Sequence, residues 1–466
     1  MRRRRTALTI GPTTSQEAPH LAQPRAARQV RRMAKPEDAL ARLSLATFDD
    51  ALGRRIIETH VWAVGEGLRG ASAYDLFDGY CQRLVAQRTA LWRAHASMKT
   101  LHPQWGGYGY TWRRDLNAIA PEQYAHDDLD GPDWVNSPFF ALVEKALAGE
   151  EAPVLRRRLE AGPEARDFPV LEEFAALGAT DYVAYLFSYG ADGDASQGTG
   201  IVYSFASDRK DGFDDADITL MGATLPALSL AMKAHAGHVI ASGLLGAYLG
   251  EDAERRVHSG AVTRGALETL NAVIWYADIR GFTPISDAYP GTAVIALLNA
   301  VFEALTATLR ARGGQVLKFI GDAMLAIFPF EAAGGADACR RALEAACEAG
   351  ATLDALNRDR SAAGLPTVAV DLALHVGEVL YGNVGAVDRL DFTVIGRAVN
   401  EAARIEALCE PLGEPILVSP EFAAMAAGGA RPLRALGEHA LRGVREPKAL
   451  FAVASGARTG TGESHA

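Results

Sequence analysis

Two aspartates in the C-terminal half of the chain have the types and positions expected of a site that binds divalent cations and triphosphates. Asp278 ends a short apolar segment that begins at Ala272, and Asp322 follows Gly321 between two apolar runs. Because a Gly-Asp pair between apolar runs is typical of a tight hairpin, we expect Asp322 at a hairpin tip. If this hairpin pairs beside the first strand, both carboxylates reach one edge of one sheet, at a spacing suited to Mg2+ ions about 3.5 to 4 Å apart.

Asn400 and Arg404 add an amide and a guanidinium to this set. They are four residues apart in a segment with helical periodicity, so we expect them on one helix face. The alternative interpretation is an exposed polar helix face. A glycine-containing loop also follows Asp278. In it, Thr283 with Pro284 resembles a helix N-cap and first helical position, whose free N–H groups would point at an anion.

The elements that must position these residues follow one another from residue 271 onward. In the first long helix, Val294, Leu297, Val301 and Leu305 keep the spacing of one apolar face. The order predicts an α/β sandwich of the split βαβ kind, with helices over one sheet. The expected elements are a strand (272–278), a helix (292–312), a hairpin (315–328), a helix (336–358), a strand (367–375), a hairpin (379–395), a helix (398–409), a strand (415–418) and a tail of short strands.

Four motifs occur here together and in order: ADIRGFT, KFIGDAMLAIF, GNVGAVDRLDFTVIGRAVNEAARIE and LRGVREPKALF. In these motifs the chain resembles the class III nucleotidyl cyclases. The resemblance implies a ferredoxin-like α/β catalytic domain, bounded here as 271–456. It also implies a lyase reaction, in which the ribose 3'-hydroxyl of a nucleoside triphosphate attacks the α-phosphorus while pyrophosphate leaves.

The resemblance assigns the metal ions to Asp278 and Asp322, with the Ile279 carbonyl completing the coordination. We therefore expect two Mg2+ ions per site, with Mn2+ as a substitute. One ion would lower the pKa of the 3'-hydroxyl, and the other would hold the triphosphate. A single Asp at a strand end is usually a turn or cap residue, so it is the pair at the family positions that indicates function.

The remaining catalytic roles also follow from the resemblance. Asn400 would orient the ribose, and Arg404 would neutralise the charge that grows on the α-phosphate in the transition state. The backbone N–H groups of Gly281, Phe282 and Thr283 would hold the β and γ phosphates.

Lys318 and Thr393 occupy the base-recognition positions of the family. An unpaired ammonium in the apolar strand around Lys318 would be costly. The family places this side chain against adenine N1, and guanylate-making members usually carry an acid there, so the lysine favours ATP. Thr393 stands where many members have Asp, which resembles a subgroup in which bicarbonate stimulation recurs. A hydroxyl accepts from the adenine amino group less strongly than a carboxylate does. Of the remaining candidates, Arg442 or Arg445 would reach the triphosphate, and His375 is expected to be a core or turn residue.

Family geometry places the metal-binding aspartates of one chain opposite four residues of a second chain, namely Lys318, Thr393, Asn400 and Arg404. Since this chain carries both halves, the resemblance implies a homodimer with two equivalent sites shared across its interface. Asp388, Arg389 and Asp391 are expected in a hairpin that faces the dimer. The predicted activity is conversion of ATP to cyclic AMP. The alternatives are a guanylate or dual-specificity cyclase and a non-catalytic regulatory dimer with a cyclase fold.

The region of residues 44–236 is expected to be a regulatory domain that receives an unidentified small-molecule or protein input. Two strands (182–189 and 201–207), a polar loop between them and a helix with an acidic first turn look similar to a GAF or PAS type sensor. Residues 237–270 are expected to form a signalling linker. Trp105, Tyr108, Tyr110 and Trp112 crowd around glycines, which indicates either an aromatic pocket or packing under a loop.

Composition narrows the remaining possibilities. The net charge is −10 and the first 35 residues are basic, so the body of the protein is acidic, which argues against a nucleic-acid binder. Residues 1–43 and 457–466 are expected to be disordered. The most apolar stretch, Leu220 to Leu249, is interrupted by Pro226 and by charged or polar residues, so no integral membrane segment is expected. Four cysteines without metal or redox spacing fit a reducing cytosol, and we expect a cytoplasmic protein.

Overall fold

The computed structural model describes residues 50–150, 152–189, 200–331 and 333–454. The predicted basic arm, the C-terminal tail and most of the polar loop between the two predicted sensor strands lie outside the described residues. The chain divides into two compact units. The first holds residues up to 236 except 101–105, and the second holds 101–105 and everything from Gly237 onward.

The first unit is built on a six-stranded antiparallel sheet with the order β3-β2-β1-β6-β5-β4. The two strands predicted from sequence are present as β5 (Asp181–Ser188) and β6 (Gly200–Ser207). Four further strands were not predicted, because glycines in β2, Pro121 in β3 and three arginines in β4 weaken the usual strand signal. They are β1 (Arg93–Lys99), β2 (Gly107–Arg113), β3 (Ala118–Tyr124) and β4 (Val154–Arg158).

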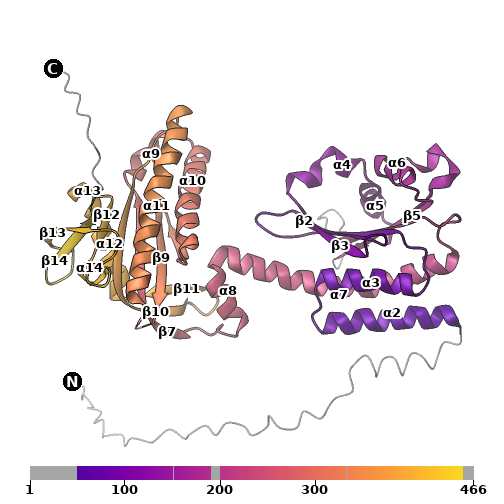
Figure 1. The fold of residues 1–466 in the computed structure, drawn as a ribbon, viewed down its shortest axis with the longest axis horizontal. Coiled ribbons are helices and arrows are strands. Elements are labelled where there is room, and N and C mark those ends of the chain that lie inside the picture. The colour runs from indigo at the N-terminus through magenta and orange to yellow at the C-terminus, as the bar shows by residue number, and fades with distance from the viewer. Residues whose placement is uncertain (1–49, 151, 190–199, 332, 455–466) are drawn as a thin grey trace, which may run out of the picture. The chain divides into compact units, whose positions relative to one another are not determined.

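Helices cover both faces of this sheet (Figure 1). One face packs against α2 (Ala51–Leu68), α3 (Ala73–Ala86) and the first part of α7 (Asp215–Leu249). The other face carries α4 (Pro132–Val135), α5 (Pro138–Leu147) and α6 (Pro169–Ala176). Short 3-10 turns occupy Asp127–Asp130, Leu159–Ala161 and Pro163–Ala165. Of the four predicted aromatic residues, Tyr108, Tyr110 and Trp112 lie in β2 and Trp105 precedes it. Trp112 is fully buried, so core packing accounts for this residue.

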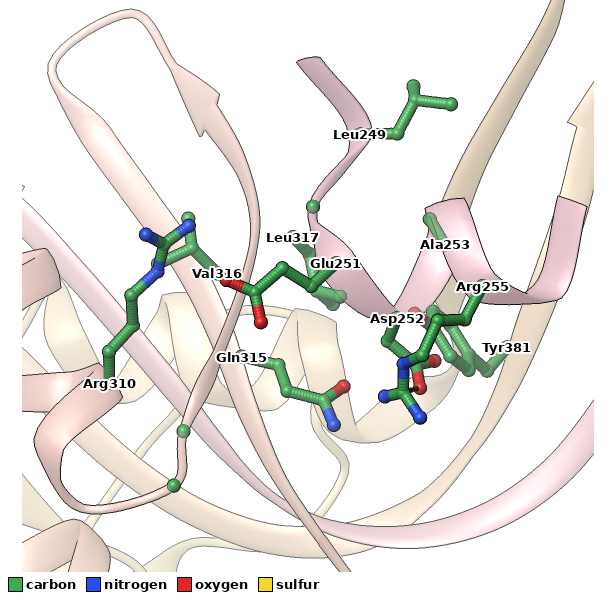
Figure 2. Close-up of a pocket in the computed structure, with 13 residues that line it drawn as sticks. Leu249, Glu251, Asp252, Ala253, Arg255, Arg310, Gln315, Val316, Leu317 and Tyr381 are labelled. Atoms are coloured by element: carbon green, nitrogen blue, oxygen red, sulfur yellow. Dashed lines mark hydrogen bonds and ion pairs between the residues drawn. The ribbon is translucent and has the colours of Figure 1, made fainter. Parts of the chain in front are cut away.

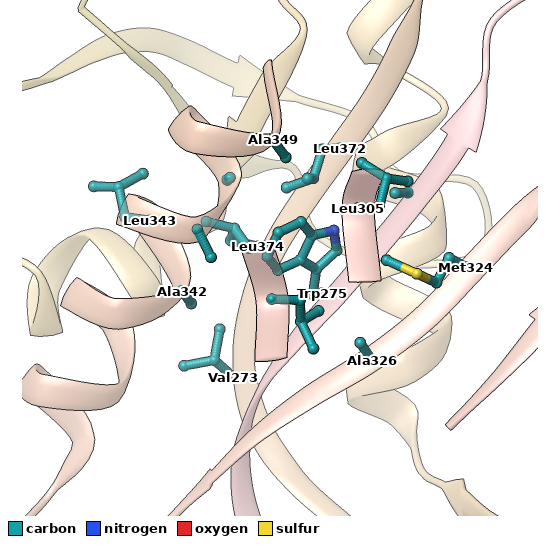
Figure 3. Close-up of a cluster of buried hydrophobic side chains, with 14 of the residues drawn as sticks. Val273, Trp275, Leu305, Met324, Ala326, Ala342, Leu343, Ala349, Leu372 and Leu374 are labelled. Atoms are coloured by element: carbon teal, nitrogen blue, oxygen red, sulfur yellow. The ribbon is translucent and has the colours of Figure 1, made fainter. Parts of the chain in front are cut away.

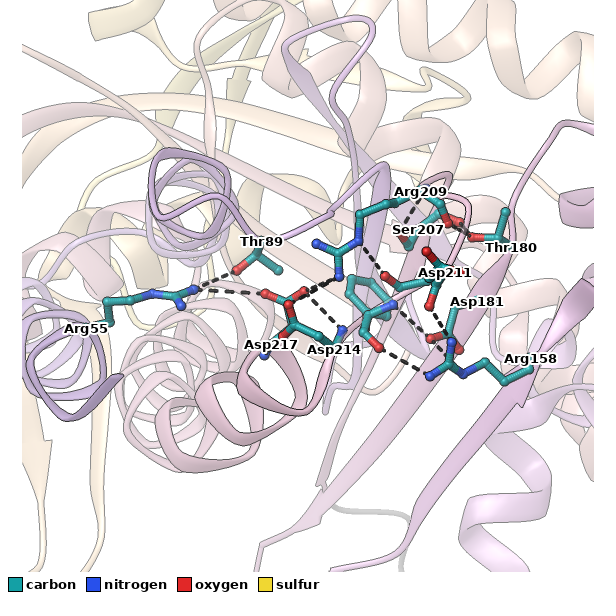
Figure 4. Close-up of polar contacts among 12 residues, drawn as sticks. Arg55, Thr89, Arg158, Thr180, Asp181, Ser207, Arg209, Asp211, Asp214 and Asp217 are labelled. Atoms are coloured by element: carbon teal, nitrogen blue, oxygen red, sulfur yellow. Dashed lines mark hydrogen bonds and ion pairs between the residues drawn. The ribbon is translucent and has the colours of Figure 1, made fainter. Parts of the chain in front are cut away.

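A buried polar network fixes the start of α7 to the sheet (Figure 4). Asp181 is fully buried, accepts from Arg156 Nη2 at 2.7 Å and accepts from the Phe213 backbone N–H at 3.0 Å. Asp217, in the acidic first turn predicted for this helix, accepts from Arg209 Nη2 at 3.0 Å. Because both carboxylates are neutralised and hydrogen-bonded, the network satisfies the conditions under which buried charges are tolerated.

The second unit is an eight-stranded sheet with the order β13-β14-β12-β10-β7-β9-β8, in which β11 also pairs with β10. The predicted elements appear as β7 (Leu267–Ile279), α10 (Gly291–Ala311), β8 (Gln315–Ile320), β9 (Ala323–Phe330), α11 (Gly335–Ala362), β10 (Val370–Gly385), β11 (Leu390–Ile395), α12 (Arg397–Glu406) and β12 (Ile416–Val418). The others are α8 (Glu251–His258), α9 (Phe282–Ala288), α13 (Cys409–Leu412), α14 (Pro420–Met425), β13 (Leu433–His439) and β14 (Lys448–Val453). The run β7-α10-β8-β9-α11-β10 has the β-α-β-β-α-β order of a split βαβ unit.

The main core of this unit lies between the central strands and the helices α10 and α11 (Figure 3). Trp275 of β7 is fully buried there, stacked on Phe328 of β9 with the ring centroids 6.1 Å apart. Leu305 and Ala342 bring the two helices onto the same core. This packing anchors β7, the strand that carries Asp278 near its end.

One expected break in the sheet does not occur. Residues 367–375 and the first arm of the hairpin at 379–395 were predicted as separate strands, but the structure joins them in β10. The strand is continuous because it pairs with β7 without interruption from Val370 to Gly382. The Gly377-Glu378 pair, which resembles a turn in sequence, is therefore held in the ladder by tertiary pairing.

Among the described residues, α10 is long and apolar enough to cross a membrane by length and composition. The sequence analysis predicted this helix (292–312) but considered Leu220 to Leu249, not α10, as the most apolar candidate for a membrane span. Leu297, Val301 and Leu309 of α10 are buried in the core of the second unit. A core helix that packs on two layers acquires the same composition as a membrane span.

Candidate active site

The structure brings the two predicted metal ligands together. Asp278 is the penultimate residue of β7, and Asp322 lies in the turn between β8 and β9. Because β7 lies beside β9 in the sheet, this turn comes next to the end of β7. The turn is possible because Gly321 takes a left-handed conformation, with φ of 65°.

The two carboxyl groups lie close enough for Asp322 to act on the ionisation of Asp278. Burial, followed by the adjacent Asp322 carboxyl, raises the pKa of Asp278 to about 7. In the described part of the chain, Asp278 Oδ1 is buried and has no hydrogen-bond partner. A buried carboxylate oxygen without a donor is costly, and a divalent cation would remove that cost.

Two further acidic residues, which the sequence analysis missed, lie around this pair. Asp371 of β10 is directly opposite Asp278 in the sheet register and is neutralised by Arg280, whose Nε donates to it at 2.9 Å. Glu406 ends α12, and burial raises its pKa to about 8, with further contributions from Asp278, Asp371 and Asp322. A signal for Asp371 was its position as an acid inside an apolar strand. The proximity of Glu406 follows only from the packing of α12 on β7.

The donor set fits a hard divalent cation that shares its coordination with a ligand. In the part of the chain that the structure describes, no group of three or more His, Cys, Asp or Glu side chains is arranged as a ready metal site. Mg2+ is typically held by one or two carboxylates together with water and substrate phosphates rather than by a protein cage. Asp278, Asp322 and the carbonyl of Ile279, which ends β7, match that pattern.

The loop after β7 turns more tightly than predicted. Gly281 is the N-cap of α9, in the left-handed conformation with φ of 65°, and the helix starts at Phe282. The prediction of Thr283 as N-cap and Pro284 as first helical position is therefore wrong. The positive φ that glycine accepts lets the helix begin earlier. Pro284 then falls in the first turn, where its missing N–H costs nothing.

Asn400 and Arg404 lie on one face of α12, as expected. Asn400 is exposed, Arg404 is half-buried, and neither forms an ion pair or side-chain hydrogen bond with the residues that the structure describes. A Cβ built on Gly443 would lie 3.7 Å from Arg404 Nη2, so the loop between β13 and β14 passes beside this guanidinium. Arg442 and Arg445 are in or next to that loop, without a contact that decides between them.

Arg404 and Glu406 point to opposite sides of the same helix. Residues two positions apart in an α-helix are rotated by about 200°, so they cannot share a face. Asp278 and Asp322 are close enough to Glu406 to contribute to its raised pKa. Arg404, in contrast, lies beside Gly443. Within one chain, Arg404 therefore lies on another side of α12 than Glu406, the residue on which Asp278 and Asp322 act.

A buried ion network holds α12 in place between these groups. Glu401, nearly fully buried, accepts from Lys448 Nζ at 2.6 Å and from Arg397 Nε at 2.7 Å. Lys448 also donates to Glu421 at 2.8 Å. His375 is buried in β10 with its Nε2 3.5 Å from Glu401, and burial lowers its pKa. It is thus a core residue, one of the two possibilities foreseen for it.

The two predicted base-recognition residues lie on β8 and β11. Lys318 of β8 forms an ion pair with Asp391 of β11. Thr393, its expected partner, lies two residues further along β11 on the same side of the strand, opposite Gly382, and is buried. Asp391 was expected only as part of a dimer-facing hairpin.

The connector helix α8 packs directly on the strand that carries Lys318. Ala253 of α8 is buried against Leu317 of β8 and Tyr381 of β10. Arg256 lies over the Tyr381 ring at 4.9 Å. A cavity of about 270 Å3 opens beside this contact, with Glu251, Arg310 and Gln315 in its lining (Figure 2). A movement of α8 would therefore change the packing against β8.

Comparison with known proteins assigns this unit. Residues 266–454 match the family described as the adenylate and guanylate cyclase catalytic domain. Residues 266–454 are a class III cyclase domain. The family resemblance seen in the motifs is thereby confirmed for this part of the chain.

The match with each curated relative covers only part of this chain and only part of the relative. An adenylate cyclase from Anabaena cylindrica is 38% identical over 159 residues, which are 33% of this chain and 30% of that protein. Adenylate cyclase 1 from Rhizobium meliloti is 33% identical over 147 residues, which are 31% of this chain and 22% of that protein. The crystal structure of the adenylyl cyclase CyaB from P. aeruginosa is 26% identical, with a TM-score of 0.38, and covers 41% of this chain and 97% of that one. The chain thus spans less than a third of the length of these curated relatives.

Proposed function

We propose that this protein is an adenylate cyclase that converts ATP to 3',5'-cyclic AMP and pyrophosphate. The observation that carries the proposal is the Asp278 and Asp322 pair, two facing carboxylates with a buried oxygen that lacks a donor, inside a domain of the cyclase family. Asn400 and Arg404, both free of intrachain partners among the described residues, are available for a ligand.

The residues of the chain divide the work of cyclisation. Two Mg2+ ions held by Asp278, Asp322 and the Ile279 carbonyl would supply Lewis acidity for the 3'-hydroxyl and charge for the triphosphate, with Mn2+ as a substitute. Asn400 orients the ribose so that its 3'-oxygen is in line with the α-phosphorus. Arg404 places a permanent positive charge where negative charge grows on the α-phosphate.

The phosphate loop and the base position complete the proposed substrate contacts. The backbone around Gly281, Phe282 and Thr283 presents N–H groups at the start of α9 to the β and γ phosphates. Lys318 donates to N1 of adenine, which is an acceptor, whereas N1 of guanine carries a hydrogen and repels a donor. Thr393 accepts from the adenine amino group. This pairing supports ATP over GTP, and it is the reason for proposing the subgroup with Lys and Thr at these positions.

We further propose a homodimer in which each site takes Asp278 and Asp322 from one chain and Lys318, Thr393, Asn400 and Arg404 from its partner. The opposed directions of Arg404 and Glu406 support it, because Arg404 lies on the side of α12 away from Glu406, on which Asp278 and Asp322 act. Exposed apolar side chains on the paired strands β10 and β11 also support it. Leu380 and Ile395 are cross-strand neighbours that are 41% and 46% exposed.

Regulation by the first unit is part of the proposal. Its antiparallel sheet with helices on both faces is compatible with a GAF or PAS type sensor. Helix α8, seated on β8, would carry the signal toward Lys318. The proposed localisation is cytoplasmic.

A direct assay tests the activity. Purified full-length protein is incubated with ATP or GTP in the presence of Mg2+ or Mn2+, and the cyclic product is identified by mass spectrometry. Cyclic AMP as the main product supports the proposal. Cyclic GMP as the main product would replace it with a guanylate cyclase, and no cyclic product from either nucleotide would favour a regulatory dimer without catalysis.

A further inference from the structure

The first unit contains a cavity of about 410 Å3 between its sheet and the helices α4, α5 and α6. Its floor is formed by Arg93 and His95 of β1, Tyr182 of β5 and Ser204 of β6. This volume lies in the range of pockets that hold small organic ligands. All lining residues belong to one unit, so the cavity does not depend on how the two units are arranged.

Arg93 brings a positive charge into this cavity, and Glu122 acts on that charge without forming an ion pair with it in the described residues. Its Nη2 lies 3.3 Å from Thr111 Oγ1, and its guanidinium covers the Phe174 ring at 4.8 Å. Over the described ranges of the chain, no carboxylate forms an ion pair with it. A guanidinium has five N–H donors in a planar fork that matches a carboxylate, and most of these remain available.

Three acids lie in or near this cavity. Asp133 and Glu173 are in its lining, and neither forms a salt bridge with Arg93 in the described part of the chain. Glu122, whose charge acts on Arg93, is already satisfied by other groups. It accepts from Thr111 Oγ1 at 2.6 Å and from the Tyr124 hydroxyl at 2.7 Å. Thr111 therefore uses its proton on Glu122 and accepts from His95 Nδ1, 2.8 Å away. His95 is 7% exposed, and its Nε2 is left as an acceptor, since its contact with the Tyr124 hydroxyl is long at 3.5 Å.

Two helices direct their N-termini at the same cavity. Ser137 caps α5 and lines the cavity together with Pro138. Helix α6 starts at Pro169 and has no side-chain cap, and its first two residues also line the cavity. Helix N-termini carry partial positive charge, so they add to the charge of Arg93 in favouring an anion.

Aromatic rings form much of the remaining wall. Phe139 stacks on the His95 ring with a centroid distance of 5.8 Å, and Phe174 and Tyr182 line the opposite part. Flat apolar walls beside a charged fork suit a ligand with an acidic head and a planar apolar body.

We propose that this cavity is a binding site for a small aromatic carboxylate, with the acid on Arg93 and the ring between Phe139 and Phe174. His95 Nε2 and the buried Ser204 hydroxyl receive a hydroxyl substituent on the ring. The site belongs to the first unit, so binding can be measured there whether or not the chain has the proposed cyclase activity.

Isothermal titration of the full-length protein tests the proposal with benzoate, phenylacetate and 4-hydroxybenzoate as probes. At least one of them should bind with a dissociation constant below about 1 mM. Benzamide, which has the same shape without the charge, should bind at least about tenfold more weakly. Inorganic phosphate, an anion without a ring, should not compete.

Two cavity variants and one control variant test whether binding occurs at this site. Arg93→Gln should abolish carboxylate binding, and Val170→Trp should block the cavity while Arg93 remains. Arg157→Gln removes an arginine of the same sheet that pairs with Asp167 outside the cavity, and it should bind like the parent protein. Absence of binding by all three carboxylates, equal binding of benzamide, or unchanged binding in both cavity variants would overturn the proposal.

Discussion

Lys318 is paired with Asp391 of its own chain, two residues before the buried Thr393 that was expected to assist it on the same side of β11. The ammonium that would read adenine is therefore engaged before any nucleotide arrives. An ammonium has three N–H donors, so adenine N1 would share it with the Asp391 carboxylate, which draws the side chain toward β11.

Removal of Asp391 should free Lys318 for ATP. The ion pair is partly exposed, and such pairs contribute up to about 1 kcal/mol, so Asp391→Asn should lower the KM for ATP by up to about fivefold. Steady-state kinetics with ATP and GTP measure the effect. Asp388→Asn, in the same hairpin, is the matched control and should leave the KM unchanged. An unchanged KM in Asp391→Asn would show that the pair does not compete with substrate.

Loss of Asp322 should abolish turnover and relieve strain at the same time. Asp322→Ala should reduce kcat by about a thousandfold or more, because one metal-binding carboxylate disappears. Without divalent cations the same variant should be at least as stable as the parent, since Asp278 no longer faces a second carboxyl. Thermal unfolding in EDTA and size-exclusion chromatography check stability and assembly. Retained turnover would contradict the metal role.

The positions of elements in the cyclase domain could be predicted, while the contacts between distant residues could not. Apolar spacing in α10 and the Gly321-Asp322 hairpin are local signals, and both elements appeared where expected. The Asp371 and Glu406 neighbours of Asp278 arise from sheet register and helix packing across many residues, which sequence periodicity does not encode. In the first unit, Arg93 and His95 belong to β1. This strand contains several polar residues, so its burial could not be predicted from the sequence.

The cyclase domain should lose stability as pH rises in the absence of metal. The pKa values of Asp278 and Glu406 are raised to about 7 and about 8, so between about pH 4 and pH 8 the folded state binds more protons than the unfolded state. Stability then falls with rising pH through this window. The unfolding free energy of the second unit, measured in EDTA at several pH values, gives the slope of stability against pH. Asp278→Asn should flatten it, and saturating Mg2+ should do the same; an identical slope in the variant would contradict the assignment.

Lys448 should act on catalysis through the position of α12. Lys448→Met removes the amino group that holds Glu401, and a buried acceptor that loses a partner costs about 1 to 3 kcal/mol. We expect kcat to fall by about tenfold while the affinity for Mg2+ is unchanged, because the aspartate pair is untouched. Lys448→Arg should restore part of kcat, which a simple loss of folding would not allow. Arg434→Met, which breaks an exposed pair with Glu414, is the control.

Two inactive variants should restore each other if the sites are shared between chains. Asp322→Ala removes one half of each site and Asn400→Ala the other half, so each homodimer is inactive. A heterodimer keeps one site with an intact Asp322 from one chain and an intact Asn400 from the other. Equal amounts, unfolded and refolded together, should reach about a quarter of the parent activity, since half of the dimers are mixed and each has one working site. Mixtures that stay at the sum of the separate variants, although exchange is verified by differently tagged chains, would contradict the shared site.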